Sequence, residues 1–453
     1  AESTRDMAKK GIERPLGPTE EMFWRFDALS PLNFSFAARI AGDLDLGELR
    51  QAIDAVQMRH PLLRVRVECD SKDVPWFRLG AGRIPLHVRD VGVEETWSAV
   101  EASLNTSLDS VHGPMAYFVL LRHGPGDATL QLVFHHAISD GRSAVFMLRD
   151  LLLSLARQRR YEMADLVELP PAGYYGDRIP TLEHYEGLEG LRTAWKTLKA
   201  SVRFLEGAGL PVGLKTGEAG PARPVEPKIF VEPRFLGGHA LKRLLDRAKK
   251  ERTTMQCVLN AALSMSVAED SPPGPLQRTS CTQVVDIRSR LVPPVEEDVG
   301  CFASGVTSLH AIDGSTRFWP FAREIREHMD HSMATPLPFF HQAMHTVYTN
   351  LGRGLGFSEP RVFSEVMSSI HPEGLAVSNL GRVELHVEDS PIRITELAFA
   401  TNTSVLNDLS TSAVTYGGRM TWAFNGSSKL GRERVARIAD RSMQKIAEAV
   451  ESE

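Results

Sequence analysis

The sequence predicts a mixed α/β protein built from two parts of similar kind. The chain has 453 residues, of which 42% are hydrophobic, so it can bury a large core and exceeds the size of one ordinary domain. Stretches with helical spacing alternate with short runs rich in β-branched residues. A segment dense in Gly and Pro, 207–227, has the composition of a linker and separates the two halves.

In the first half, one helix is clearly marked. Its apolar residues follow the i, i+3, i+4, i+7 pattern from Leu49 to Val56, Asp45 and Glu48 have capping-box spacing, and Pro61 marks its end. A second helix is predicted over 142–160, where the spacing is again helical and the end is basic. The strands predicted for this half are 62–69, 115–122 and 128–136.

The second half repeats this mixture. Helices are predicted over 237–254 and around 255–269. The strands predicted for this half are 282–287, 374–380, 383–387 and 420–424. We therefore expect an N-terminal subdomain over 1–206, a crossing linker over 207–227 and a C-terminal subdomain over 228–453.

Charge and composition argue against several classes of partner. The 52 basic and 57 acidic residues leave a net charge of −5, which offers no electrostatic footprint for nucleic acid or an anionic membrane. No run approaches the roughly 18 to 20 apolar residues that span a bilayer. The opening residues are too charged for a secretory signal, so we expect a cytoplasmic protein. The four cysteines lack CxxC spacing, which favours neither a zinc site nor a disulfide framework.

The stretch "LVFHHAISDGRSAV" (132–145) places two histidines at the end of a predicted strand, followed by Asp140 and Gly141. One interpretation is structural: Asp140 caps the helix that begins near Gly141, and glycine permits the tight turn. The other is catalytic. Neighbouring strand residues point to opposite faces, so His135 turns inward and His136 faces the other side. For the same reason the two histidines cannot easily bind one metal ion.

Other catalytic chemistries find little support in the residues. There is no HExxH helix for zinc and no GxSxG elbow for a serine hydrolase. Cys301, in "VGCFASG", is open to two interpretations, a thiol nucleophile or a small buried residue. A single histidine acting as a general base remains, since an imidazole with a pKa of about 6.5 can accept a proton at neutral pH.

The residues around the two histidines resemble a motif of a known superfamily. His135, His136, Asp140 and Gly141 form the HHxxxDG motif of the superfamily that contains condensation domains and chloramphenicol-acetyltransferase-like enzymes. The segments that extend the resemblance, in chain order, are "RPLGPTEEMFWRFD" (14–27), "RHPLLR" (59–64), "GPMAYFVLLR" (113–122), "VDIRSRLVPPVEEDVGCFASG" (285–305) and "AVSNLGRV" (376–383). The chain is most similar to free-standing polyketide-associated, mycocerosyl-transferase-like acyltransferases. "GCFASG" departs from the usual GxFVNT of peptide-synthetase condensation domains.

The resemblance implies two similar subdomains that form a V, with an active-site tunnel between them. It implies that His136 deprotonates the acceptor and that His135 is mainly structural. Asp140 is expected to pair with an arginine of the second half, Arg288 by first choice and Arg290 by second. Backbone N–H groups near Gly141, with side chains near Ser378 and Asn379, are candidate oxyanion or substrate contacts; a turn between strands explains the latter two equally well.

The resemblance also implies substrates and partners. The acyl donor is a phosphopantetheine thioester on an acyl or peptidyl carrier protein or on coenzyme A, with no metal and no bound cofactor. We expect transfer to a hydroxyl, forming an ester in secondary-metabolite or lipid biosynthesis. Two alternatives stay open: a free-standing condensation enzyme that forms an amide, as in nonribosomal peptide synthesis, and a catalytically silent binding protein. The basic segment Arg157 to Arg160 suits an acidic carrier protein, or is simply a solvated helix end.

Overall fold

A computed structural model of the protein describes residues 12–160, 166–171, 173–180, 228–272, 276–339, 345, 349 and 374–451. The predicted linker 207–227 lies outside these residues, so the predicted division into subdomains stays a prediction. The described part is mixed α/β, as the sequence predicts, and its strands form two main sheets and one small hairpin.

The first sheet has the strand order β11-β1-β6-β5-β4. Its strands are β1 (Asn33–Gly42), β4 (Leu86–Asp90), β5 (Ala116–Gly124), β6 (Asp127–His135) and β11 (Ile392–Thr401). The strand β11 comes from the second half of the chain and pairs antiparallel with β1, Phe36 opposite Phe399. The second half of the sequence therefore completes the first sheet, which the pattern of the sequence does not reveal.

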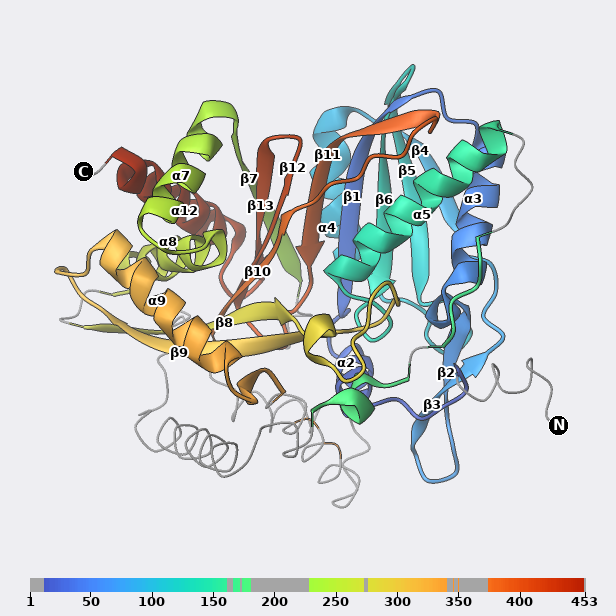
Figure 1. The fold of residues 1–453 in the computed structure, drawn as a ribbon, viewed down its shortest axis with the longest axis horizontal. Coiled ribbons are helices and arrows are strands. Elements are labelled where there is room, and N and C mark those ends of the chain that lie inside the picture. The colour runs from blue at the N-terminus through green and yellow to red at the C-terminus, as the bar shows by residue number, and fades with distance from the viewer. Residues whose placement is uncertain are drawn as a thin grey trace.

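Helices cover both faces of this sheet, and the alternation along β1 shows why. Its Phe36, Ala38 and Ile40 belong to the core beneath α3 (Leu46–Arg59) and α5 (Gly141–Arg159). Ala37 points the other way, toward α4 (Thr96–Leu104). Figure 1 shows α3 and α5 in front of the sheet and α4 behind it.

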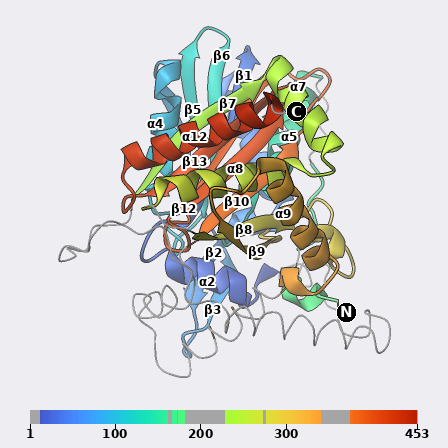
Figure 2. The same ribbon diagram turned by 90° about the vertical axis from the view of Figure 1, so that its left-hand side faces the viewer.

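The second sheet has the order β7-β13-β12-β10-β8-β9. Its strands are β7 (Ile229–Gly237), β8 (Gln277–Asp286), β9 (Ala303–Ile312), β10 (Leu375–Arg382), β12 (Leu409–Tyr416) and β13 (Arg419–Ser427). The helices packed with it are α7 (Gly238–Lys250), α8 (Met255–Asp270), α9 (Phe318–Met333) and α12 (Arg432–Glu451). In Figure 2, α7, α8 and α12 lie across the near face of this sheet.

Two further elements lie near the junction of the sheets. The helix α2 (Pro18–Phe26) lies below the first sheet in Figure 1, and β2 (Val65–Cys69) and β3 (Pro75–Leu79) form the hairpin beside it. The strand β11 lies beside β12 although the two belong to different sheets. The sheets therefore meet along this line, and the ends of β6, β8, β9 and β10 come together below it.

Most elements predicted from the pattern are present. The helix predicted after Asp45 is α3, and Asp45 caps it by accepting from the Glu48 N–H. The strand prediction over 383–387 is wrong. In this segment Val383 and Leu385 are buried and alternate with exposed residues, but they pack into the core of the first sheet, and the segment belongs to no strand although the Val383 N–H donates to the Thr415 carbonyl of β12. One-sided burial produces the same alternation as a strand does.

No helix in the described residues is both long and apolar enough to cross a membrane.

Candidate active site

The site is a cavity of about 390 Å³ at the junction of the two sheets. Its walls come from α2, from the turn that follows β6, from the strands β8, β9 and β10, and from the segment 403–407. His136, Asp140, Arg288, Ser378 and Asn379 all line it. The fold thus brings together residues that are more than two hundred positions apart in the sequence.

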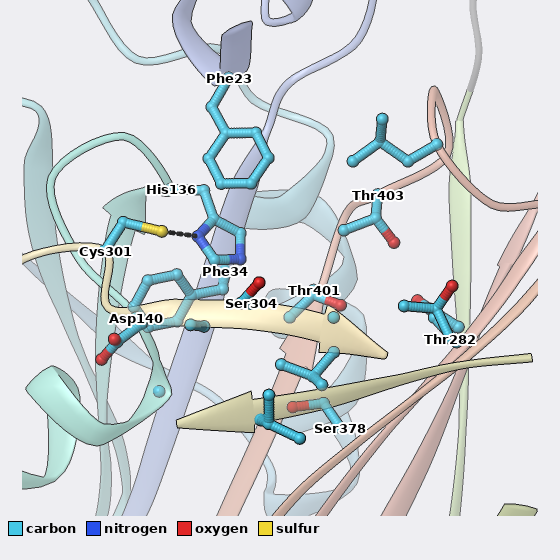
Figure 3. A pocket seen from close by; sticks show the side chains of 18 of the residues that line it. Phe23, Phe34, His136, Asp140, Thr282, Cys301, Ser304, Ser378, Thr401 and Thr403 are labelled. Carbon is cyan, nitrogen blue, oxygen red and sulfur yellow. Dashed lines mark hydrogen bonds between the residues drawn. The ribbon is translucent and has the colours of Figure 1, made fainter. Parts of the chain in front are cut away.

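His136 directly follows the end of β6, and its backbone N–H donates to the carbonyl of Leu32. Its ring lies against two aromatic rings, with centroid distances of 4.8 Å to Phe23 and 5.5 Å to Phe34. Figure 3 shows Nδ1 facing Cys301 while the other ring nitrogen, Nε2, points into the cavity. The geometry leaves Nε2 as the atom available to a substrate.

The surroundings of His136 keep its imidazole neutral. Burial lowers the pKa of this group below its ordinary value, and the carbonyls of His136 and Ser139, together with the charge of Asp140, only partly oppose the effect. A neutral imidazole at pH 7 is the form that can accept a proton.

His135 occupies a closed environment on the opposite face. Its side chain is fully buried, and its Nδ1 accepts a hydrogen bond of 3.0 Å from the Ala137 N–H. Nε2 therefore carries the proton, and it faces Asp27 Oδ1 at 3.5 Å. Burial lowers the pKa of His135 to about 3, so the ring stays neutral.

Asp140 acts as a helix cap and as an ion-pair partner at the same time. Its Oδ1 accepts from the Ser143 N–H at 2.8 Å, which caps α5. Arg288 donates from Nη1 to Oδ2 at 2.9 Å and from Nη2 to Oδ1 at 3.0 Å, and the Phe302 N–H adds a bond of 2.8 Å to Oδ2. Burial would raise the pKa of Asp140, but the Arg288 charge and these donors hold it below its ordinary value.

This carboxylate joins the two halves of the chain. Arg288 begins the short helix Arg288–Arg290 after β8, and both side chains of the pair are about 5% exposed or less. The Ser143 hydroxyl lies 2.9 Å from both Asp140 Oδ1 and the Gly300 carbonyl oxygen. Arg290, the second choice from the sequence, donates instead to the carbonyls of Met333 and Thr335.

Gly141 has a different role from the one expected. It does not adopt a positive φ, so the turn does not require glycine for its backbone angles. A Cβ at this position would lie 3.0 Å from Cδ2 of Leu380 on β10. The missing side chain allows the start of α5 to approach the second sheet closely.

Ser378 and Asn379 lie within β10 rather than in a turn. Both line the cavity, and Figure 3 shows Ser378 on the wall across from His136. Asn379 Oδ1 accepts from the Gly381 N–H at 2.9 Å, which leaves its amide NH₂ for a ligand or solvent within the described part of the chain. Their role as oxyanion or substrate contacts stays a proposal.

Cys301 is buried in the cavity wall, and its Sγ lies 4.0 Å from His136 Nδ1. Burial raises the pKa of the thiol well above its ordinary value, so it is protonated at neutral pH. A nucleophilic cysteine needs the opposite shift. The geometry favours the interpretation of Cys301 as a small buried neighbour of His136.

The segment "RHPLLR" builds a second polar network outside the cavity. His60 Nε2 lies 3.0 Å from Asp150 Oδ2 on α5, and Arg59 donates to the same oxygen at 2.7 Å. Arg149 and Arg59 also bind Glu297 from the second half. These contacts support the helix that carries Asp140.

Sequence reasoning missed several residues of the cavity. Phe23 and Thr19 lie one helical turn apart on α2, Phe23 beside His136 and Thr19 bonded to Tyr175 at 2.9 Å and to His345 Nδ1 at 3.0 Å. The apolar residues of "EEMFWRF" have helical spacing, which was the available signal for α2. No local pattern in the sequence connects Thr19 with Tyr175 or His345, which lie 156 and 326 positions later.

Two known family models match this chain, one in each half. The condensation-domain family model matches residues 26–196. The model described as "Phthiocerol/phthiodiolone dimycocerosyl transferase C-terminus" matches residues 236–422. The chain belongs to the condensation-domain superfamily.

Solved structures of other proteins have the same fold along nearly the whole chain. Polyketide synthase associated protein 5 from Mycobacterium tuberculosis superposes with a TM-score of 0.65 at 17% identity and covers 96% of this chain and 97% of its own. The epimerization domain from the third module of tyrocidine synthetase B gives 0.69 at 17% identity, with 97% and 96% covered.

Segments of much larger proteins are also similar in sequence. The dimodular nonribosomal peptide synthase of Bacillus subtilis is 28% identical over 280 residues, which is 57% of this chain and 11% of the synthase. The cyclosporin synthetase of Tolypocladium inflatum is 33% identical over 148 residues, 30% of this chain and 1% of that protein. The chain thus corresponds to a small part of these synthetases.

Proposed function

We propose that the protein is an acyltransferase in which His136 is the general base. The observation that carries the proposal is the position of a neutral imidazole, with Nε2 open to the cavity and Nδ1 turned toward Cys301. A base so placed needs no covalent intermediate, and general-base help of this kind is commonly worth roughly 10² to 10⁴ in rate.

The proposed donor is an acyl thioester of phosphopantetheine, on a carrier protein or on coenzyme A, and the proposed acceptor is a hydroxyl. His136 Nε2 takes the hydroxyl proton as the oxygen attacks the thioester carbonyl carbon. The tetrahedral oxyanion then collapses, the carbon–sulfur bond breaks, and the thiolate receives the proton from His136. The products are an ester and a free thiol, and no oxidant or reductant is consumed.

Ester formation is favoured by two considerations. The dimycocerosyl transferase model covers much of the second half, including β8, β9 and β10 of the cavity wall. A neutral hydroxyl has a pKa far above that of imidazole, so proton removal must accompany attack, which makes a well-placed base more important for an alcohol than for a neutral amine. Amide formation is the second candidate, supported by the condensation-domain match over the motif that contains His136.

The oxyanion requires hydrogen-bond donors at the place where charge develops. The backbone N–H of Gly141, the Ser378 hydroxyl and the Asn379 amide are the candidates, since all three residues line the cavity with His136. Substitution of Ser378 or Asn379 should lower kcat more than it raises KM, because the oxyanion exists only along the reaction path.

The deciding experiment incubates the purified protein with hexanoyl-coenzyme A and matched acceptors, 1-octanol and 1-octylamine, and follows both products by mass spectrometry. A carrier protein loaded with the same hexanoyl group replaces coenzyme A in a second series. Ester that forms with the wild-type protein and not with His136→Ala supports the proposal. Amide without ester would favour the condensation alternative, and no product with any donor or acceptor in a wider panel would favour the silent binding protein.

A further inference from the structure

Two of the residues that line the cavity are exposed, Arg142 and Asp286, and all other described residues of the lining are buried or half-buried. Arg142 lies in the first turn of α5, and Asp286 is the last residue of β8. These residues therefore mark a mouth of the cavity, beside the ion pair of Asp140 and Arg288.

Three guanidinium groups surround one aromatic ring at this mouth. Arg142, Arg149 and Arg288 lie 5.9, 5.6 and 5.7 Å from the ring centroid of Phe146. Two of these charges are compensated within the protein, Arg149 by Asp150 and Glu297 and Arg288 by Asp140. Within the described part of the chain, Arg142 makes no ion pair and donates no hydrogen bond.

The basic end of the same helix differs in this respect. Arg159 pairs with Glu48 at 3.0 Å, and Arg160 pairs with Asp389. The charges of Arg159 and Arg160 at the far end of α5 are thus paired within the protein. The guanidinium of Arg142 instead lies over the ring of Phe146 at the entrance to the cavity. An uncompensated cation at this place is suited to an anionic ligand that enters the mouth.

We infer that Arg142 binds the phosphate of the donor's phosphopantetheine arm, so that the mouth beside α5 is the entrance for the donor. The inference rests on the proposed function, which requires a donor that carries an anionic phosphate on one end and a thioester on the other. Arg142 and His136 line the same cavity and are six residues apart, at most about 22 Å in extended chain, so one elongated ligand can reach both. A planar guanidinium suits a phosphate because it can donate two parallel hydrogen bonds.

Asp286 provides an internal check on this assignment. Its Oδ1 accepts from the Arg288 N–H at 2.9 Å, and Arg288 Nη1 lies 3.4 Å away, so the carboxylate is turned toward Arg288. It nevertheless contributes negative charge at the mouth. Removal of this charge should favour an incoming phosphate, the opposite of the effect expected at Arg142.

The test compares two donors that differ by one phosphate, S-hexanoyl 4′-phosphopantetheine and S-hexanoyl pantetheine. Their dissociation constants are measured by calorimetry, without an acceptor, for the wild-type protein, Arg142→Gln and Arg142→Lys. We expect the wild-type protein to bind the phosphorylated donor about tenfold or more tightly than pantetheine, because hydrogen bonds to charged groups are among the stronger ones. This preference should vanish in Arg142→Gln, persist in part in Arg142→Lys, and decrease with added salt.

The matched control is Arg89→Gln, which removes an exposed arginine of the edge strand β4, outside the cavity lining. It should keep the full preference, and Asp286→Asn should increase it. A wild-type protein without preference, an Arg142→Gln variant that keeps the preference, or a protein that binds neither donor overturns the inference. The inference is also overturned if Arg142→Gln weakens the binding of a carboxylate-bearing acceptor and leaves the binding of the donor unchanged.

Failure of this inference can be distinguished from failure of the proposed function. Turnover of S-hexanoyl N-acetylcysteamine, a donor without phosphate, tests the proposed chemistry separately because it requires the base His136 and involves no phosphate. If the wild-type protein consumes this short donor and His136→Ala does not, the proposed chemistry stands whatever the binding data show.

Discussion

His135 and His136 are neighbours of the same type, yet their environments differ in every respect that matters for chemistry. His135 is enclosed, with Nδ1 bonded to a backbone N–H and Nε2 directed at Asp27. His136 lies between two aromatic rings and a thiol, with one nitrogen open to the cavity. The alternation at the end of β6 separates them onto opposite faces. The comparison teaches that side-chain direction, rather than residue type, encloses one ring in the protein and opens the other, the proposed general base, to the cavity.

The largest expected effect sharpens this contrast. We expect His136→Ala to lower kcat/KM by roughly 10² to 10⁴, because the base is removed, while the melting temperature changes little, because the ring faces a cavity. The measurements are steady-state kinetics with hexanoyl-coenzyme A and 1-octanol, and calorimetric unfolding. His112→Ala, at a ring that is 82% exposed, is the control and should change neither quantity. Wild-type turnover in His136→Ala would refute the assignment.

The second largest effect is expected at Asp140, which follows the two histidines and caps α5. Asp140→Asn keeps an oxygen for the helix cap but removes the charge beside Arg288, and loss of one partner of a buried ion pair costs about 3 to 5 kcal/mol. Unfolding in urea measures the loss.

Asp45→Asn is the matched control for Asp140→Asn, because Asp45 caps α3 at an exposed position. This variant should be nearly silent, since Asn caps a helix about as well as Asp. Equal losses for the two variants would show that Asp140 serves only as a cap.

A smaller effect tests the closed environment of His135. Burial raises the pKa of Asp27 to about 6, above its unfolded value, so the stability from Asp27 is present at low pH and is lost as pH rises through 6. Burial of neutral His135 acts with the opposite sign, because the unfolded ring takes up a proton below about pH 6.5. In the wild-type protein these two proton uptakes largely offset each other between pH 6 and 4.

Removal of Asp27 should therefore uncover the acid sensitivity of His135. We expect Asp27→Asn to lose about 1 kcal/mol of stability relative to the wild-type protein when the pH falls from 7.5 to 5.5. Urea unfolding at the two pH values measures the difference. A difference in stability between Asp27→Asn and the wild-type protein that does not depend on pH would contradict this prediction.

The smallest expected effect concerns the thiol beside His136. Because burial keeps Cys301 protonated, Cys301→Ala should retain turnover within about tenfold of the wild-type value, whereas loss of a nucleophile would abolish it. Initial rates with the same donor and acceptor decide between these outcomes. The control for the loss of a buried side chain is Val377→Ala, because Val377 is buried in β10 and does not line the cavity.

Local sequence determined a large part of this molecule. Helical spacing and a cap residue define α3, a strand followed by Asp and Gly defines the end of β6 and the start of α5, and the HHxxxDG pattern selects His136. These features arise within one or two turns of chain, where backbone geometry and side-chain direction depend on near neighbours. The pairing of Asp140 with Arg288 was expected from the family resemblance, and the structure contains it.

Only the tertiary structure decided the rest. The segment 383–387 has the alternating pattern of a strand, but the alternation arises because its buried side chains pack into the core. The strand β11 joins the first sheet although it lies in the second half, and Gly141 is small because Leu380 approaches it. Thr19 reaches His345, and among the described residues the charge of Arg142 has no ion-pair partner while Arg149 and Arg288 are paired. Each of these facts depends on which distant residues occupy the same volume, and no local pattern in the chain encodes that information.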